Sequence, residues 1–372
     1  MSALEKSKRQ HLELCLTLHR AVAPAGANSC FSPYSIASAL GLLASATRGK
    51  TAEELTALLA GSADELARQA ELLLGASSLA DDHGREKPVI AVSNTLWAWD
   101  KLPLNEEFLD VLATWPNGAV APASFIDDPE NARQVINSDV AKTTRGLIPE
   151  LLLPGAVAGD AVAALVNALY LKAAWIHPFA ESATKPGDFH SPKGIVSVPT
   201  MRQTESLGYA ERDGWQVVTL PSAGGTEAVV LLPEGDLAEA EAALDAEALS
   251  RLLAESRRVK VDLTLPKFEV DVRTELTDVL KALGIRTVFT GDADFTPLST
   301  DARLAVYDVL HQAVLRVGEQ GFEGAAATAV MIRTLSMNLA DPVVVRVDRP
   351  FLLVVRHAAT GVVYFLSRIT EP

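Results

Sequence analysis

The chain has 372 residues, 48% of them hydrophobic, and a formal net charge of −14 at pH 7. The acidic excess argues against nucleic acid and anionic membranes as partners, because both repel negative charge, and no apolar run is as long as a membrane span. Since no linker-like, repeated or low-complexity stretch divides the sequence, we expect a single large domain over residues 1–372.

In chain order, the expected helices dominate early and the expected strands dominate late. Apolar periodicity predicts a helix over 4–23, and Ser32-Pro33 and the Thr51 capping box are typical helix starts. The uniformly apolar stretch 161–171 predicts a strand buried on both faces. The other expected helices are 129–144, 236–256 and 274–283, and the other expected strands are 215–220, 228–232, 259–265, 304–317, 343–347, 351–356 and 361–369. This order predicts an α+β fold rather than alternating βαβ units.

The motifs give no positive sign of catalysis. The stretch 44–51 fits a relaxed phosphate-binding loop, but the residues before it favour a helix instead of the required strand, so nucleotide binding is not expected. The seven histidines lack metal-ligand spacing, and no Gly-x-Ser-x-Gly elbow occurs. We therefore expect no enzyme activity, no metal and no cofactor. Cys15 and Cys30 are expected to be reduced packing residues, with a disulfide or redox role as the alternative.

Two polar residues stand inside strands that are otherwise apolar. Asn167 lies in the stretch 161–171 and His311 in the stretch 304–317. Because a buried amide needs a hydrogen-bond partner, we expect His311 to pair with Asn167, and the hydroxyls of Ser32 and Ser35 to complete a network. Taken alone, these residues form a satisfied polar cluster of the core.

The segment 318–342 is the least ordinary part of the sequence. It is rich in Gly and Ala, lies between two strand-like stretches, and is too long for a structureless connection. Taken in steps of two, it alternates between a face that runs from Phe322 to Ile332 and a face with charged ends at Glu323 and Arg333, which is typical of a half-buried strand. A segment that can be an exposed loop or a buried strand is a conformational switch.

That segment, together with motifs spread over nearly the whole chain, resembles the serpin family, and the chain is similar to its prokaryotic inhibitory members. The matching motifs, in the family's order, are 28–36, 93–97, 104–108, 165–172 with Trp175 and 178–179, 265–268, 280–285, 293–295, 349–352 and 361–365. The resemblance implies one serpin domain with a large central mixed β-sheet, further sheets, about nine helices and an exposed reactive-centre loop at about 318–342.

The resemblance also assigns roles to individual residues. The bond cleaved by the protease is expected between Leu335 and Ser336. The shutter, where the central strands part, comprises Ser32, Ser35, Asn167 and His311, and the breach, where the loop enters the sheet, is marked by Trp175, which otherwise is an ordinary core residue. The hinge of the loop comprises Glu319, Gly321, Phe322, Glu323, Gly324, Ala325, Ala326, Ala327 and Thr328.

The implied function is irreversible suicide-substrate inhibition by a metastable fold, in which the cleaved loop enters the central sheet while the acylated protease is still attached. Leu335 favours chymotrypsin-like serine proteases first and elastase- or subtilisin-like ones next. Heparin is not expected because the helix at 51–59 has no basic cluster, and a monomer is expected. The alternative is a non-inhibitory serpin, a protease substrate, chaperone or carrier, since inhibitory members usually have threonine where Phe322 stands.

The site of action in the cell stays open. Residues 1–10 are charged and lack the apolar stretch of a signal peptide, which indicates a cytoplasmic protein unless a leader was trimmed or export is unconventional. The family that the chain resembles is often extracellular.

Overall fold

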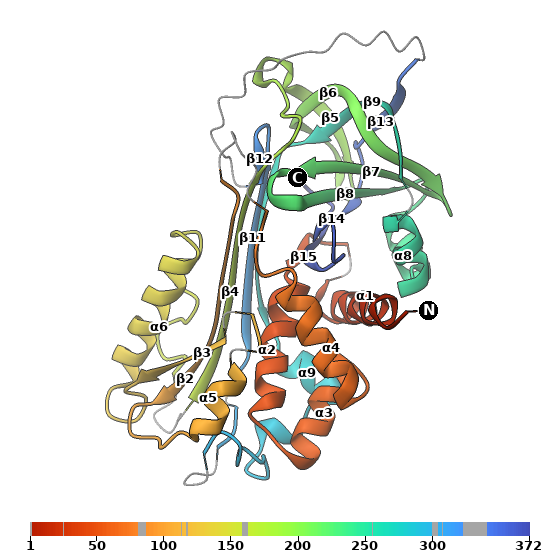
Figure 1. The fold of residues 1–372 in the computed structure, drawn as a ribbon. Helices are drawn as coiled ribbons and strands as arrows, with labels where there is room; N and C mark the ends of the chain where they lie inside the picture. The colour runs from red at the N-terminus through yellow and green to blue at the C-terminus, as the bar shows by residue number, and fades with distance from the viewer. Residues whose placement is uncertain are drawn as a thin grey trace.

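The structure, a computed structural model, describes residues 2–24, 26–80, 87–112, 114–116, 118–157, 163–254, 256–299, 304–306, 308–322 and 341–372. Within these ranges nine α-helices combine with two β-sheets, which confirms the expected α+β class (Figure 1). The helices are α1 Ala3–Val22, α2 Pro33–Ser45, α3 Gly49–Leu59, α4 Ala63–Leu74, α5 Glu106–Leu112, α6 Pro129–Thr143, α7 Leu237–Ala243, α8 Ala246–Ala254 and α9 Thr277–Ala282.

A six-stranded sheet forms the long axis of the molecule, in the strand order β10-β11-β12-β4-β2-β3 (Figure 1). β2 pairs antiparallel with β4 but parallel with β3, so the sheet is mixed, as expected. β4 is buried along most of its length, which explains why its sequence is apolar apart from Asn167 and Lys172. The strands are β2 Val89–Trp99, β3 Gly118–Ala123, β4 Ala163–Ala174, β10 Phe268–Glu275, β11 Leu310–Gly318 and β12 Gly321–Phe322.

Helices α2 and α6 cover opposite faces of this central sheet (Figure 1). Ile36 of α2 belongs to the main hydrophobic core together with Leu165 of β4. On the other face, Ile136 of α6 packs in a second, smaller core with Val166, the next residue of β4. Because successive strand residues point to opposite faces, β4 has a separate apolar partner on each side.

The second sheet has nine strands and lies beside one end of the central sheet (Figure 1). Its order is β1-β15-β14-β8-β7-β6-β9-β13, and β5 pairs with β6 outside this path. β7 and most of β9 alternate between buried and partly exposed residues, whereas β8 and β14 are buried along most of their length. The strands are β1 Ser29–Phe31, β5 Lys185–Ser191, β6 Gly194–Arg212, β7 Trp215–Ser222, β8 Thr226–Pro233, β9 Arg257–Pro266, β13 Val343–Arg346, β14 Phe351–His357 and β15 Val363–Ile369.

Three of the expected helix boundaries are wrong. The helix expected to start at the Thr51 capping box starts at Gly49, and its N-cap residue Arg48 makes no side-chain cap hydrogen bond. The single helix expected over 236–256 is two helices, because Leu244 is extended and buried, and Asp245 accepts a hydrogen bond from the backbone N–H of Ala248, which starts α8. The helix expected from 274 begins only at Thr277, since Glu275 still belongs to β10. At Leu244 the burial of an extended residue and the local cap at Asp245 override the helical apolar pattern, and at Glu275 the pairing of β10 with β11 does so.

The strand expected over 304–317 begins late, at Leu310. The backbone N–H of Val309 donates to side-chain oxygens of Thr277 and Asp308, and its carbonyl accepts from the N–H of Leu276. These contacts occupy the backbone groups that a ladder would use, so the strand cannot extend further toward the N-terminus.

Cys15 and Cys30 are both buried and unbonded, which confirms the expected packing role. Burial raises the pKa of each thiol, so both stay protonated at neutral pH. Within the described ranges no helix combines the length and the apolar character that crossing a bilayer would require.

Candidate functional site

The beginning of the expected reactive-centre loop is folded into the central sheet. Val317 of β11 pairs with Phe322, and Gly318 pairs with Gly321, so Glu319 and Gln320 form a two-residue turn between β11 and β12. The expected loop boundary at 318 is therefore wrong, because residues 318–322 are a hairpin and not an exposed loop.

Glycine is required at the start of β12. Gly321 has φ +149°, and a Cβ atom there would lie 2.1 Å from the carbonyl oxygen of Ala173. No other side chain allows the backbone of β12 to approach β4 this closely. Gly321 thus lets β12 lie in the sheet beside β4.

Phe322 and Trp175 lock the hairpin in place. Phe322 is fully buried between β11 and β4, and its ring meets the ring of Trp175 edge to face, with 4.7 Å between the ring centroids. The indole N–H of Trp175 donates to the Gly318 carbonyl at 2.9 Å, and its backbone N–H donates to the Gln320 carbonyl at 2.9 Å. Trp175 is a core residue, as one of the two sequence readings had it, and it also holds both sides of the turn.

Glu319 anchors the outer side of the turn. Its carboxylate lies 3.0 Å from Lys267 Nζ and accepts a hydrogen bond from the Thr184 hydroxyl at 3.0 Å. Burial alone would raise the pKa of Glu319, but the hydrogen bonds from Lys267 and Thr184 outweigh it and lower the pKa. The backbone carbonyl of Glu319 accepts from the N–H of Phe179 as well. The hairpin is therefore held by the side chain and the backbone of the same residue.

Two of the four expected shutter residues, His311 and Asn167, lie at the single point where β11 and β4 pair directly within the described residues. There His311 is the register partner of Asn167, and both side chains are buried. The expected hydrogen bond between these two side chains is wrong: His311 Nε2 accepts from the backbone N–H of Ser32 at 3.0 Å, whereas Asn167 Nδ2 donates to the Ser93 carbonyl at 3.5 Å. Proximity was predicted correctly, but the partners were not.

The serine hydroxyls also differ from the expectation. Ser32 Oγ accepts from the backbone N–H of Ser35 at 3.1 Å and so caps α2, and Ser35 Oγ has no partner among the described residues. Neither hydroxyl reaches Asn167. The four shutter residues are neighbours without forming one closed network.

Two buried groups of the shutter are left without partners in the described part of the chain, namely Asn167 Oδ1 and His311 Nδ1. Because Nε2 of His311 accepts a hydrogen bond, the neutral ring carries its proton on Nδ1. Asn167 and His311 also line a cavity of about 10 Å³ between β4, β11 and α2. The residues that carry this unused acceptor and this unused donor therefore line the same small cavity.

Burial lowers the pKa of His11 and of His311 to about 4. Above about pH 6.5 both rings are neutral in the folded and the unfolded chain, so these two histidines do not make the free energy of unfolding depend on pH there. As the pH falls from about 6.5 to 4, only the unfolded chain gains these protons, and the free energy of unfolding drops by up to about 1.4 kcal/mol per pH unit for each ring. We expect urea unfolding at a series of pH values to show this decline in the free energy of unfolding. In His311→Gln the slope of that free energy against pH should be smaller by about 1.4 kcal/mol per pH unit, which corresponds to one proton. His190→Gln, at an exposed position of β5, should leave the slope unchanged; an equal change in both variants would contradict the assignment.

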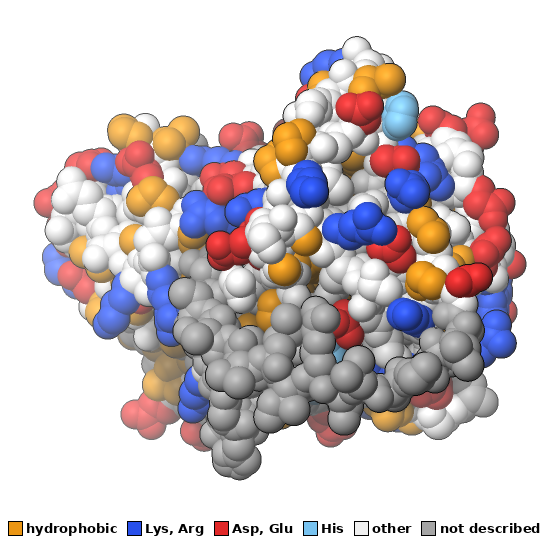
Figure 2. Space-filling view, turned by 90° about the horizontal axis from the view of Figure 1, so that it is seen from above, with side chains coloured by type: hydrophobic (Ala, Val, Ile, Leu, Met, Phe, Trp, Pro, Cys, Tyr) orange, Lys and Arg blue, Asp and Glu red, His pale blue; other side chains and the backbone are white. Residues whose placement is uncertain are grey.

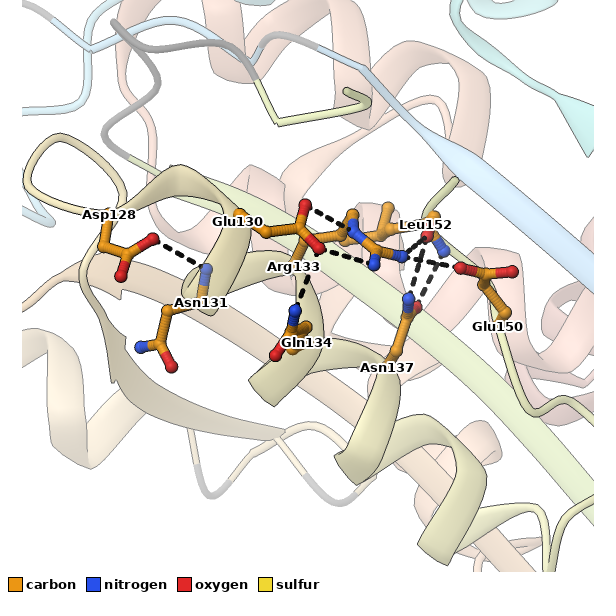
Figure 3. Close-up of polar contacts among 8 residues, drawn as sticks. All are labelled: Asp128, Glu130, Asn131, Arg133, Gln134, Asn137, Glu150 and Leu152. Atoms are coloured by element: carbon orange, nitrogen blue, oxygen red, sulfur yellow. Dashed lines mark hydrogen bonds and ion pairs between the residues drawn. The ribbon is translucent and has the colours of Figure 1, made fainter. Parts of the chain in front are cut away.

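Ion pairs and hydrogen bonds of Arg133 and Asn137 hold the segment after α6 in place. The sequence analysis did not predict them. Figure 3 shows the Arg133 guanidinium between Glu130, at 2.7 Å and 2.9 Å, and Glu150, at 2.7 Å, with a further bond of 2.9 Å to the Leu152 carbonyl. Asn137 bonds both the N–H and the carbonyl of Leu152 at 2.8 Å. Hydrogen bonds from Arg133 lower the pKa of Glu130 to about 2. The spacing of Glu130 and Arg133 on one helix turn was a visible signal, but their contact with 150–152 was not.

The remaining expected site residues lie outside the described part of the chain. These are the hinge positions Glu323, Gly324, Ala325, Ala326, Ala327 and Thr328, and the reactive bond between Leu335 and Ser336.

Comparisons with known proteins give the class. The sequence model of the serpin (serine protease inhibitor) family matches residues 9–372. A serpin-like protein of Thermococcus kodakarensis is 34% identical over 95% of this chain and 83% of its own length, and the plasma serine protease inhibitor of Bos taurus is 32% identical over 95% and 88%. The structure of human thyroxine-binding globulin complexed with thyroxine has a TM-score of 0.86 and 26% identity, covering 100% of both chains.

The chain belongs to the serpin family. Its mixed central sheet, its second sheet and its nine described helices are those of a serpin, as the resemblance implied. The family is one of protease inhibitors and not of enzymes, in agreement with the sequence.

Proposed function

We propose that the protein is an irreversible suicide-substrate inhibitor of chymotrypsin-like serine proteases. The observation that carries the proposal is that Gly321 and Phe322 already form a strand between β11 and β4, antiparallel to both. The N-terminal end of the loop thus already lies between the two strands that a longer inserted strand would pair with. Insertion would then continue an existing hairpin and would not have to open the sheet from nothing.

The register of β12 fixes where each later residue would lie. Phe322 pairs with Val317 on one side and Ala173 on the other, so each further residue of the loop meets one residue earlier in β11 and one earlier in β4. The positions opposite Ala326 are Ala313 and Leu169, and those opposite Thr328 are His311 and Asn167. All four of these neighbours are buried. Ala326 would therefore enter the core, and Thr328 would separate the two shutter residues.

The other face of the inserted strand would pass beneath α6. Residues 325, 327 and 329 would lie in the row of Val314 and Leu310 of β11, which pack in the same core as Ile136 of α6. All three positions are alanine. Small side chains suit a strand that must fit into this packed layer, where overpacking would be destabilising.

Thr328 would complete the shutter. Its side chain would point to the same face as Asn167 and His311, because directly opposed residues of neighbouring strands share a face. A hydroxyl can donate to the unused Asn167 Oδ1 and accept from the unused His311 Nδ1. Asn167 Oδ1 and His311 Nδ1 would then find hydrogen-bond partners only after insertion.

Thr328→Val tests this step. The isosteric change should lower the midpoint of thermal unfolding of the cleaved form, where the hydroxyl is buried, and leave the uncleaved form unchanged. The loss should be about 1–3 kcal/mol, the usual penalty for an unsatisfied buried group. Thr334→Val is the matched control because residue 334 would not reach the shutter; a similar loss in both variants would contradict the register.

The chemistry of trapping follows from this movement. The protease serine attacks the carbonyl carbon of Leu335, the amine of Ser336 leaves, and an acyl-enzyme ester remains. Insertion of the released strand then draws Leu335 and the attached protease along the sheet, which distorts the oxyanion hole that hydrolysis needs. On the face of the molecule seen from above, acidic and basic side chains are interspersed (Figure 2). Such a face has no strong charge preference, in line with recognition through the loop and without heparin.

Leu335→Arg tests the position of the reactive bond. Trypsin-like proteases bind a basic residue before the cleaved bond, so the variant should lose chymotrypsin inhibition by at least roughly tenfold and gain trypsin inhibition. Arg333→Leu is the control, and it should leave chymotrypsin inhibition intact. Inhibition of trypsin by the unmodified protein, lost in Arg333→Leu, would move the reactive bond to residue 333.

A second candidate function is the carriage of a small molecule, as the name of thyroxine-binding globulin says of that protein. The observation that favours it is a cavity of about 510 Å³ between α1, α7 and β14. Leu16, Leu237 and Leu352 line it, and the ion pair of Glu241 with Arg368 lies at its wall. This combination of apolar lining and a few polar groups is typical of ligand sites.

Thermal unfolding with a panel of aromatic and aliphatic carboxylates distinguishes the candidates. A carrier should show a saturable rise in midpoint that is lost in Leu237→Trp, which fills the cavity. If no ligand changes the unfolding midpoint and the protein inhibits proteases, the carrier function is excluded and the inhibitor function stands.

A further inference from the structure

A second large cavity lies between α1, α3 and the segment after α9. Its volume is about 500 Å³, and Leu283 and Gly284 close one side. One face of α1 contributes Gln10, Glu13 and Thr17. These residues recur every three or four positions, so they form a single stripe of the helix that faces α3.

The polar groups of this cavity are nearly all acceptors. Glu13 is exposed and makes no ion pair or hydrogen bond among the described residues. Gln10 donates its amide N–H to the Ala60 carbonyl at 2.9 Å, and its buried Oε1 receives no hydrogen bond there. Glu54, also at the wall, accepts from the backbone N–H groups of Arg286 and Thr287, each at 2.7 Å. Burial would raise the pKa of Glu54, but these bonds outweigh it and lower the pKa, so the group stays anionic.

The end of α3 adds further negative potential. The N–H groups of Ala60 and Gly61 both donate to the Thr56 carbonyl, so the carbonyls of Ala57 and Leu58 receive no hydrogen bond from the described residues. These are the last carbonyls of an eleven-residue helix, where the helix dipole is negative.

No lysine, arginine or histidine is among the residues that line the cavity in the described chain. Lys50 approaches Glu54 to 3.9 Å but lies outside, with its side chain 76% exposed. Leu14 and Leu58 supply apolar surface between the acceptors. The cavity therefore offers acceptors and negative charge without an internal counter-ion, next to surface suited to methylene groups.

We propose that this cavity binds an alkylammonium ligand, with a linear polyamine as the fitting class. An ammonium group supplies the donors that Glu13, Gln10 and the end of α3 lack, and the methylene chain covers Leu14 and Leu58. The site is independent of protease inhibition, because none of its residues belongs to the hinge, the breach or the shutter.

Isothermal titration with spermidine at about 0.15 M salt tests the site, since general attraction to an acidic protein is largely screened there. We expect saturable binding at one site, and at least roughly tenfold weaker binding in Glu13→Gln, the usual effect of losing a charged hydrogen-bond partner. Glu53→Gln is the matched control, because it removes the same charge from an exposed position of α3 outside the cavity. It should bind like the unmodified protein.

Ala57→Trp gives a second readout that keeps every charge. Ala57 is exposed on α3 and lines the cavity, so the indole should fill the site and abolish binding while the unfolding midpoint stays unchanged. 1,6-Hexanediol, which has no charge, should not bind. Equal weakening in Glu13→Gln and Glu53→Gln, binding that persists in Ala57→Trp, or no saturable binding of spermidine would each overturn the proposal.

Discussion

Replacing Ala326 by arginine is expected to convert the protein from an inhibitor into a plain substrate. If the inserted loop continues the register of Phe322, residue 326 would lie between Ala313 and Leu169, which are 1% and 4% exposed. An arginine cannot enter that row without losing its hydration, and a buried unpaired charge costs several kcal/mol. Insertion then stalls before the protease is distorted, and the acyl-enzyme is hydrolysed.

Titration of chymotrypsin with increasing amounts of Ala326→Arg measures the effect. The number of inhibitor molecules consumed for each protease molecule inactivated should rise by at least roughly tenfold, whereas cleavage of the loop stays fast. Asn338→Arg is the matched control, since it adds the same charge beyond the proposed reactive bond, in a part of the loop that the proposed mechanism leaves outside the sheet. Full trapping by Ala326→Arg would show that the register is wrong.

Replacing Phe322 by alanine is expected to destabilise the uncleaved protein. The side chain is fully buried against Trp175, and truncation of a buried phenylalanine costs about 3–5 kcal/mol. Urea unfolding of the uncleaved protein should show this loss, and limited proteolysis should find the turn at Glu319 and Gln320 newly accessible.

Val330→Ala is the control for Phe322→Ala. Residue 330 would be buried only after insertion, so its truncation should destabilise the cleaved form and leave the uncleaved form unaffected. If Phe322→Ala left the uncleaved protein as stable as before, β12 would not be part of the native sheet in solution.

The sequence allowed the fold and the neighbours within the site to be predicted, because both rest on patterns local to a segment. The apolar run around Asn167 indicated a central strand, and its polar residue correctly predicted the vicinity of His311. The actual partners, the Ser32 and Ser93 backbones, depend on a fraction of an ångström in the packing of α2 and β2, which no pattern in the sequence reports.

The state of the hinge could not be predicted for a different reason. The alternation that begins at Phe322 is the same whether the residue is exposed or seated in the sheet, so the pattern indicates a strand without its position. Whether Phe322 is exposed or buried depends on whether its ring can pack against Trp175 between β11 and β4. Phe322, the residue on which the non-inhibitory alternative rests, is already buried in the structure.

Incubation with chymotrypsin, followed by a denaturing gel, tests the central claim most directly. The account predicts a band at the summed mass of the protease and the inhibitor cleaved at the reactive bond, together with a small released fragment whose sequence begins at Ser336. Complete cleavage of the loop, with the protease fully active afterwards and no such band, would contradict trapping and leave a non-inhibitory serpin.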